Sequence, residues 1–197
     1  MITNGSRLNP AVMLDLAPHL SVLGLSLDSC SKKTNWEIGR ADRQGGVLPT
    51  EKLPEVLASA RRLNPQMRVK INTVVNALNW REDMSDFIGS LAPDKWKVLR
   101  MLPTVTDDLA ISHENFQAFV RRHDGLGKVL RAEDNSEMAE SYLMIDPHGR
   151  FFQNALGRKG YDYSAPIIEA GAPSAFSQIS VSSEKFCARY TQDQPGA

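Results

Sequence analysis

Cysteine, long apolar runs and an excess of either charge are scarce in this sequence, and each shortage excludes a class of protein. The two cysteines, Cys30 and Cys187, stand far apart among 197 residues. A disulfide scaffold is therefore excluded, and a reducing, cytoplasmic setting is expected. No run approaches the roughly 18 apolar residues of a membrane span, and residues 1–10 lack the apolar core of a signal peptide.

The charges balance, because 23 Lys and Arg residues stand against 23 Asp and Glu residues. Without a net field, neither a nucleic acid nor a membrane is an expected partner, and any attraction for phosphate must be local. The four histidines, at positions 19, 113, 123 and 148, do not cluster, so no metal site is predicted from them. The sequence also lacks a glycine-rich phosphate-binding fingerprint.

The hydrophobic pattern alternates between strands and helices. Strands are predicted at residues 22–29, 68–75 and 95–102, and residues 142–153 indicate a hairpin. Helices are predicted from Asn9-Pro10, from Thr50 to about Leu63, over residues 82–91, from the cap Ser112 to about His123, and near Ala172 and Ser183. Such alternation with short connections predicts an α/β fold with a parallel sheet, as a barrel or partial barrel.

The chain begins inside a strand–helix repeat. Residues 2–6 have the character of the carboxyl end of a strand, with almost none of that strand present. We therefore expect upstream structure, removed by a miscalled start or by truncation. The alternative is a short edge strand.

Polar residues two apart recur on three consecutive predicted strands: Ser26 and Asp28, Lys70 and Asn72, Lys95 and Lys97. Period two places each pair on one side of its strand. A buried lysine requires a negative partner, so inward lysines favour a polyphosphate ligand. The alternative is that these residues lie at exposed strand ends. Trp96 alternates with the two lysines beside it and should pack against a helix on the opposite face.

Two further candidates have equally ordinary explanations. Arg40 follows a helix-like turn, and its guanidinium fits a carboxylate through two hydrogen bonds, although a surface arginine is the simpler interpretation. Tyr142 begins a predicted strand and either presents its hydroxyl to a ligand or packs in the core.

Six segments together resemble the viperin family of radical S-adenosylmethionine (SAM) enzymes. They are TNGS at 3–6, LSLDS at 25–29, NWEIGR at 35–40, VKINTVVNALNWREDM at 69–84, KWKVL at 95–99 and SYLMIDPHGRF at 141–151. Their order and spacing also match, over most of the chain. The combination is far more specific than any single segment, and the segments at 69–84 and 95–99 are the strongest part.

The resemblance implies a partial (βα) barrel of the radical SAM type, with a C-terminal hairpin and short helices, here lacking its first strands. Residues 1–155 would form the C-terminal part of the barrel, and residues 156–197 an extension of the same domain. It implies a lyase that uses SAM, a 4Fe-4S cluster and an electron donor. Such enzymes dehydrate a nucleoside triphosphate (CTP, GTP or UTP) to its 3′-deoxy-3′,4′-didehydro analogue in antiviral defence.

The resemblance also implies residue roles. Ser26 and Arg40 match positions that hold SAM through its ribose and its methionine carboxylate, and Asn4 and Ser6 lie on the strand end that borders the SAM pocket. The positions that match triphosphate contacts are Lys70, Asn72, Lys95 and Lys97, where Lys95 replaces an arginine of the vertebrate forms. Tyr142 matches a residue near the nucleotide ribose. No catalytic residue is assigned.

The sequence departs from the family at one decisive motif. The CxxxCxxC motif, whose thiolates ligate the cluster, is absent, and we expect it in an N-terminal segment upstream of Met1. Two other functions remain open. One is a non-catalytic nucleotide-binding remnant, or a subunit completed by another polypeptide. The other is a radical SAM maturase that acts on a peptide or RNA.

Overall fold

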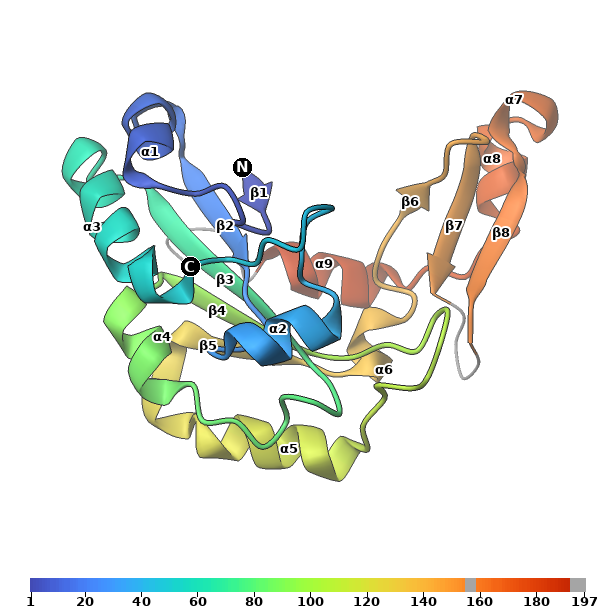
Figure 1. Ribbon diagram of the computed structural model, residues 1–197. Helices are drawn as coiled ribbons and strands as arrows, with labels where there is room; N and C mark the ends of the chain where they lie inside the picture. Colours follow the sequence, from blue (N-terminus) through green and yellow to red (C-terminus); the bar gives the residue numbers. More distant parts are fainter. Residues whose placement is uncertain (155–158, 192–197) are drawn as a thin grey trace. The chain divides into compact units, whose positions relative to one another are not determined.

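The computed structural model describes residues 1–154 and 159–191, with side chains described up to residue 188 (Figure 1). The chain divides into two compact units. The first comprises Met1–Met101 and Ile111–Ala132, and the second comprises Leu102–Ala110 and Glu133–Ala197. The predicted division between residues 155 and 156 lies outside the described residues and stays a prediction.

The first unit is built on a five-stranded sheet in the order β1-β2-β3-β4-β5. Its strands are Ile2–Thr3 (β1), Val22–Ser26 (β2), Arg68–Val75 (β3), Lys95–Arg100 (β4) and Leu130–Glu133 (β5). Strands β1 to β4 pair in parallel. Their carboxyl ends therefore meet at one edge of the sheet, where ligands of α/β proteins usually bind.

The first unit contains five α-helices, two of which begin at predicted side-chain caps. The helices are Pro10–Leu16 (α1), Lys32–Ile38 (α2), Leu53–Leu63 (α3), Ser85–Leu91 (α4) and His113–Arg122 (α5). The side chain of Asn9 accepts a hydrogen bond from the Val12 N–H at 3.0 Å, with Pro10 in the first turn. The Ser112 hydroxyl accepts one from the Asn115 N–H at 3.1 Å. Both predicted caps are confirmed, since each satisfies a backbone donor that the helix leaves open.

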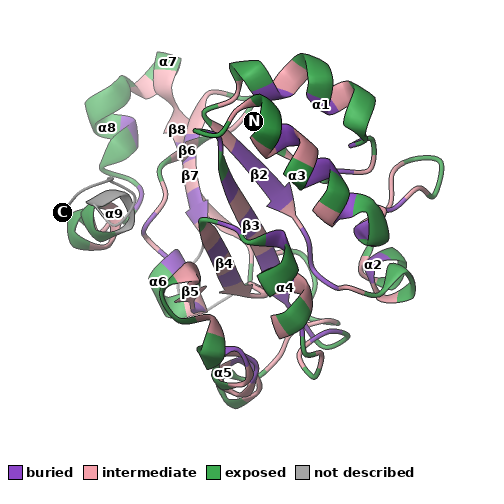
Figure 2. Ribbon diagram, turned by 90° about the vertical axis from the view of Figure 1, so that its left-hand side faces the viewer, coloured by how far each residue is buried: buried purple, intermediate pink, exposed green. Residues whose placement is uncertain are grey.

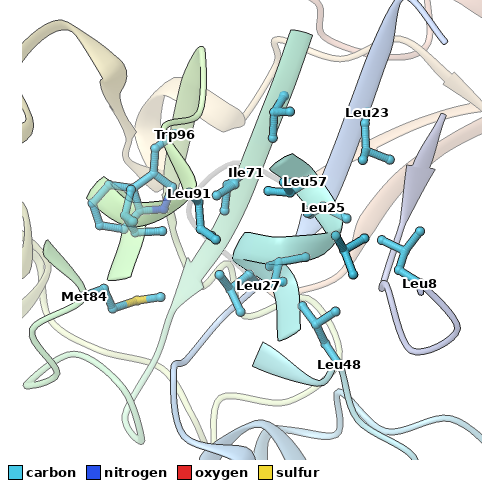
Figure 3. Packing of buried hydrophobic residues seen from close by; sticks show 14 of the residues in the cluster. Leu8, Leu23, Leu25, Leu27, Leu48, Leu57, Ile71, Met84, Leu91 and Trp96 are labelled. Atoms are coloured by element: carbon cyan, nitrogen blue, oxygen red, sulfur yellow. The ribbon is translucent and has the colours of Figure 1, made fainter. Parts of the chain in front are cut away.

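Helices α1, α3 and α4 cover one face of the sheet (Figure 2). The alternation of β3 explains why, because Val69, Ile71, Thr73 and Val75 are buried while the residues between them are less so. Figure 3 shows the cluster that fills this layer, from Leu23 and Leu25 on β2 to Leu57 on α3 and Leu91 on α4. Burial of these side chains, at about 1.5–3 kcal/mol each, is the main force that holds the layers together.

The second unit contains a three-stranded antiparallel sheet of Met144–Ile145 (β6), Arg150–Asn154 (β7) and Tyr161–Pro166 (β8). Its helices are Asn135–Met138 (α6), Ile167–Ala170 (α7), Ala172–Phe176 (α8) and Ser183–Thr191 (α9). At the hairpin turn, the Asp146 carboxylate accepts hydrogen bonds from the Arg150 side chain at 2.9 and 2.7 Å. The predicted hairpin and the short helices near Ala172 and Ser183 are confirmed.

The predicted α/β fold with a parallel sheet is confirmed, while several boundaries differ. The helix expected over residues 82–91 begins at Ser85, because the Glu82 carboxylate bonds instead to Ser29 and Cys30. The strands expected to reach residues 29 and 102 end at Ser26 and Arg100. Within the described residues, none of the helices combines the length and apolar character that a membrane crossing requires.

Candidate functional site

Five of the predicted site residues share one face of the sheet. In the strand register, Ser26 of β2 lies beside Asn72 of β3, and Asn72 lies beside Lys97 of β4. One pleat earlier, Lys70 lies beside Lys95. All five are half-buried and point away from the helix-covered face, which takes the intervening residues.

The register fixes the spacing of this polar face. Neighbouring strands lie about 4.8 Å apart and residues two apart on a strand about 6.5 Å apart. Lys70, Lys95 and Lys97 therefore start from backbone positions that a single polyphosphate spans.

A buried hydrogen-bond chain holds β2, β3 and β4 in this register. The Trp96 indole N–H donates to the Thr73 hydroxyl at 2.8 Å, and the Thr73 hydroxyl donates to the Leu27 carbonyl at 2.6 Å. Trp96 and Thr73 are fully buried. Trp96 packs edge-on against Phe119 of α5, with 6.0 Å between ring centroids, which confirms that it faces a helix. Fixing Trp96 on one face sets the direction of Lys95 and Lys97 on the other.

Arg40 is held at the same edge of the sheet by Asp28. The Arg40 Nε donates to the Asp28 carboxylate at 2.5 Å, and the Asp28 side chain is 1% exposed against 32% for Arg40. Helix α2 is capped at its C-terminus by Gly39 in the left-handed conformation (φ 90°), and Arg40 follows this glycine directly. The Asn35 side chain of α2 donates to the Ser29 carbonyl at 2.6 Å. Helix α2, which the sequence indicated only as a helix-like turn, thus carries Arg40 to the end of β2.

Asn4 and Ser6 form a turn directly after β1. The Asn4 side-chain oxygen accepts from the Ser6 N–H at 3.2 Å and from the Ser6 hydroxyl at 3.1 Å. Gly5 between them adopts a φ of 73°, which glycine reaches without the penalty of a side chain. Because Thr3 pairs with Leu25, this turn begins next to Ser26. The structure therefore brings Asn4 and Ser6 to the same sheet edge as Ser26.

Tyr142 belongs to the second compact unit, apart from the other eight predicted residues. It is half-buried and precedes β6, which begins at Met144 and not at residue 142 as predicted. The boundary was placed too early, since no strand pairing includes Tyr142. Its role near a ribose stays a prediction.

Sequence reasoning did not identify the loop after β3 as part of this edge. The Asn79 side chain donates to the Asp28 carbonyl at 2.7 Å and to the Val74 carbonyl at 2.9 Å. The Glu82 carboxylate accepts from the Ser29 hydroxyl at 2.6 Å and from the Cys30 N–H at 2.7 Å. The buried amide of Asn79 and the half-buried carboxylate of Glu82 thus tie this loop to the end of β2 and make it rigid. Both residues lie in the segment at 69–84 that resembles the family, but that resemblance assigned them no role.

The described residues do not fit an iron–sulfur cluster. Nowhere in residues 1–154 and 159–191 do three His, Cys, Asp or Glu side chains gather as a metal site requires. Burial, reinforced by the neighbouring Glu82, raises the pKa of the Cys30 thiol to about 12, whereas cluster ligands are thiolates. Cys187 is exposed and lies in the other unit.

Arg40 fits one end of SAM. Its guanidinium has five N–H donors, of which the contact with Asp28 uses one. A planar fork of N–H donors pairs well with a carboxylate such as the one on the methionine part of SAM. The carboxyl-end side of the sheet thus brings the Arg40 guanidinium together with the hydroxyl of Ser26 and the amide of Asn72.

Comparisons with known proteins find relatives that match most of the chain. Over 96% of its length, the chain is 46% identical to the S-adenosylmethionine-dependent nucleotide dehydratase of Psychrobacter lutiphocae and 42% identical to the protein of that name from Pseudoalteromonas ulvae. Over 89% of its length, it is 32% identical to the S-adenosylmethionine-dependent nucleotide dehydratase RSAD2 of Danio rerio. The chain spans 63%, 62% and 50% of these relatives.

A solved structure described as "Native anSMEcpe with bound AdoMet" resembles the chain with a TM-score of 0.55 and 14% sequence identity. The match covers 94% of this chain and 57% of the solved one. At that identity the likeness concerns the fold alone. No protein-family model matches the chain.

Proposed function

Over the part of its relatives that it spans, this chain belongs to the viperin-type S-adenosylmethionine-dependent nucleotide dehydratases, and on that premise we propose that it supplies the SAM- and nucleotide-binding surface of such a lyase. The reaction removes water from the ribose of a nucleoside triphosphate (CTP, GTP or UTP), which leaves the 3′-deoxy-3′,4′-didehydro analogue. Its role is antiviral defence in the cytoplasm. The observation that carries the proposal is the shared polar face of β2, β3 and β4.

The triphosphate binds to Lys70, Lys95 and Lys97, with the Asn72 amide as a neutral donor. Support comes from the register, which puts these four side chains in two adjacent rows on the half-buried face. Charge-assisted hydrogen bonds to phosphate are about twice as strong as neutral ones. At partial burial these bonds favour a triphosphate over a monophosphate, because the triphosphate carries more negative charge. The match of Tyr142 to a residue near the ribose stays a prediction from the family resemblance.

SAM binds at the neighbouring strand ends. Arg40 pairs with its methionine carboxylate, Ser26 bonds to its ribose, and the turn of Asn4 and Ser6 borders the adenosine. Support comes from the pairing of β1 with β2, which brings this turn beside Ser26, and from the partly exposed guanidinium of Arg40.

A 4Fe-4S cluster and an electron donor belong to the proposal as family features. When SAM is bound to a reduced cluster, the pair supplies the radical that starts the chemistry. The described residues do not fit as ligands of such a cluster. The contribution of this chain is therefore to bind and orient the two ligands, SAM and the nucleotide.

Binding measurements on the purified chain test the proposal. We expect CTP to bind more tightly than CMP, and Lys97→Ala to weaken CTP about tenfold or more while SAM binding survives. Arg40→Ala should show the reverse preference. Lys52→Ala is the matched control, because Lys52 is exposed outside the site. Equal affinity for CTP and CMP, or equal effects of Lys97→Ala and Lys52→Ala, would remove the nucleotide assignment.

A turnover assay then separates the alternatives. The chain is joined to an N-terminal segment that carries the CxxxCxxC motif, loaded anaerobically with iron and sulfide, and incubated with SAM, CTP and a reductant. The proposal predicts 5′-deoxyadenosine together with a dehydrated nucleotide, detected by mass spectrometry. Triphosphate binding without either product would favour a non-catalytic nucleotide-binding protein. Formation of 5′-deoxyadenosine with a peptide or RNA in place of CTP would favour a maturase.

A further inference from the structure

Asp28 is a buried carboxylate whose partners connect two parts of the proposed SAM-binding edge. One oxygen accepts from the Val74 N–H at 2.8 Å, and the other accepts from the Arg40 Nε at 2.5 Å. An unpaired buried carboxylate would be costly, and these two bonds compensate for its burial. An amide oxygen could accept either hydrogen bond alone, but only a carboxylate has an acceptor oxygen for each of the two donors.

The bond to Val74 fixes where Asp28 lies. Val74 follows Asn72 by one pleat on β3, and Asn72 lies beside Ser26. The Asp28 carboxylate therefore lies beside β3, just beyond the row of Ser26 and Asn72. The Arg40 side chain, which bonds to Asp28, therefore lies close enough to Ser26, Asn72 and Lys97 for one bound ligand to reach them.

The geometry of the Arg40 contact leaves a particular edge of the guanidinium available. Asp28 engages Nε, and within the described part of the chain the side chain of Arg40 makes no other hydrogen bond. The edge formed by the two Nη atoms is the other side suited to a carboxylate. Because Asp28 is 1% exposed and Arg40 is 32% exposed, the anchored side is buried and the opposite side faces solvent.

We propose that Asp28 is a positioning residue, which holds the Nε side of Arg40 so that its Nη edge receives the methionine carboxylate of SAM. This inference rests on the proposed function, because it assigns the pre-organisation of the same site. Pre-organisation raises affinity by reducing the rotamer freedom that binding removes. The long side chain of an unanchored arginine would lose that advantage.

The test compares two ligands that differ at the methionine end. SAM carries the amino-acid carboxylate, and 5′-methylthioadenosine lacks it. In Asp28→Asn, the amide oxygen still accepts from Val74, but the amide nitrogen meets Nε donor to donor, so Arg40 loses its anchor. We expect the preference for SAM over 5′-methylthioadenosine to fall about five- to tenfold, somewhat below the 10–100-fold effect of losing an outer-shell partner at metal sites. Binding of 5′-methylthioadenosine and of CTP should stay unchanged.

A double-mutant cycle separates positioning from structural support. If Asp28 acts through Arg40, the double variant Asp28→Asn/Arg40→Ala should prefer SAM over 5′-methylthioadenosine as much as Arg40→Ala alone does. The proposal would be overturned if the two substitutions reduced the preference for SAM additively. It would also be overturned if Asp28→Asn weakened the binding of SAM, 5′-methylthioadenosine and CTP equally. Asp15→Asn, at an exposed position on α1, is the control.

A second variant keeps the proposal falsifiable if Asp28→Asn does not fold. Arg40→Lys retains the charge, but a single ammonium cannot hold Asp28 and present a fork to a carboxylate. We expect it to lose the preference for SAM almost as fully as Arg40→Ala, and a retained preference would contradict the inference. Failure of the unmodified protein to bind either adenosine ligand while it binds CTP would instead overturn the SAM assignment itself.

Discussion

Lys70 and Lys95 lie side by side, in register, on neighbouring parallel strands and on the same half-buried face of the sheet. The register thus puts two positively charged side chains next to each other on this face. In the proposed function this pair binds the triphosphate, so binding of such an anion should also stabilise the fold.

Inorganic tripolyphosphate should raise the melting temperature of the chain. At about 100 times its dissociation constant, a ligand stabilises the folded state by about 2.7 kcal/mol, which corresponds to a shift of roughly 5–10 °C for a protein of this size. Differential scanning fluorimetry measures it. Without ligand, Lys70→Gln should melt at the same or a higher temperature than the unmodified protein. With tripolyphosphate, its melting temperature should rise by less. If tripolyphosphate raised the melting temperature of the unmodified protein and of Lys70→Gln equally, the anion would bind at another position.

Lys95→Arg should bind CTP at least as tightly as the unmodified protein, and Lys95→Gln should bind it more weakly. Both arginine and lysine carry the charge, but arginine adds a planar fork that suits phosphate oxygens. Isothermal titration calorimetry gives the two affinities. Identical affinities for the arginine and glutamine variants would mean that position 95 does not contact the triphosphate.

Acid should destabilise the first unit through His123. The Phe119 carbonyl, at 2.7 Å, requires the proton on Nδ1, and the Met84 N–H donates to Nε2 at 2.9 Å. This bonding fits a neutral ring, and burial lowers the pKa of His123 below its ordinary value of 6.5. As pH falls below 6.5, the unfolded chain takes up the proton first, so the stability gained from the neutral ring is lost.

The corresponding variant is His123→Gln. Its free energy of unfolding in urea should depend less on pH between 6.5 and 5 than that of the unmodified protein. At pH 8, it should be lower by about 1–3 kcal/mol, since buried groups lose their partners. An unchanged pH dependence would show that another group controls acid sensitivity.

Trp96→Phe should lower stability by about 1–3 kcal/mol. It removes the donor to Thr73 at 2.8 Å and leaves that buried hydroxyl with one bond fewer. Trp36→Phe, at a position that is 62% exposed, should change stability by less than about 0.5 kcal/mol. Equal effects in chemical denaturation would contradict the assignment of Trp96 as the residue that locks β4 to β3.

Alkylation should distinguish the two cysteines. With a pKa raised to about 12 from 9.0, Cys30 holds on the order of a thousandfold less thiolate near neutral pH than an ordinary thiol, and thiolate is the reactive form. Iodoacetamide at pH 8 should modify the exposed Cys187 first, as peptide mass mapping would record. Glu82→Gln should speed modification of Cys30, because it removes a negative neighbour. Faster labelling of Cys30 than of Cys187 would refute the raised pKa.

Local signals in the sequence determined much of the fold. Asn9 and Ser112 cap their helices as predicted because capping involves only the next three residues. The faces of β3 and β4 followed from period two, since alternation is a property of the strand itself. The shared face of Lys70, Asn72, Lys95 and Lys97 was therefore predictable before their neighbours across the sheet were known.

Only the tertiary structure decided what surrounds those side chains. The Asp28–Arg40 pair and the bonds from Asn79 and Glu82 to the end of β2 depend on how the chain returns to the same edge. Glu82 meets Cys30 from 52 positions away, and no periodicity reaches so far. Local preferences set the direction in which each side chain points, and long-range packing sets which partner it finds there.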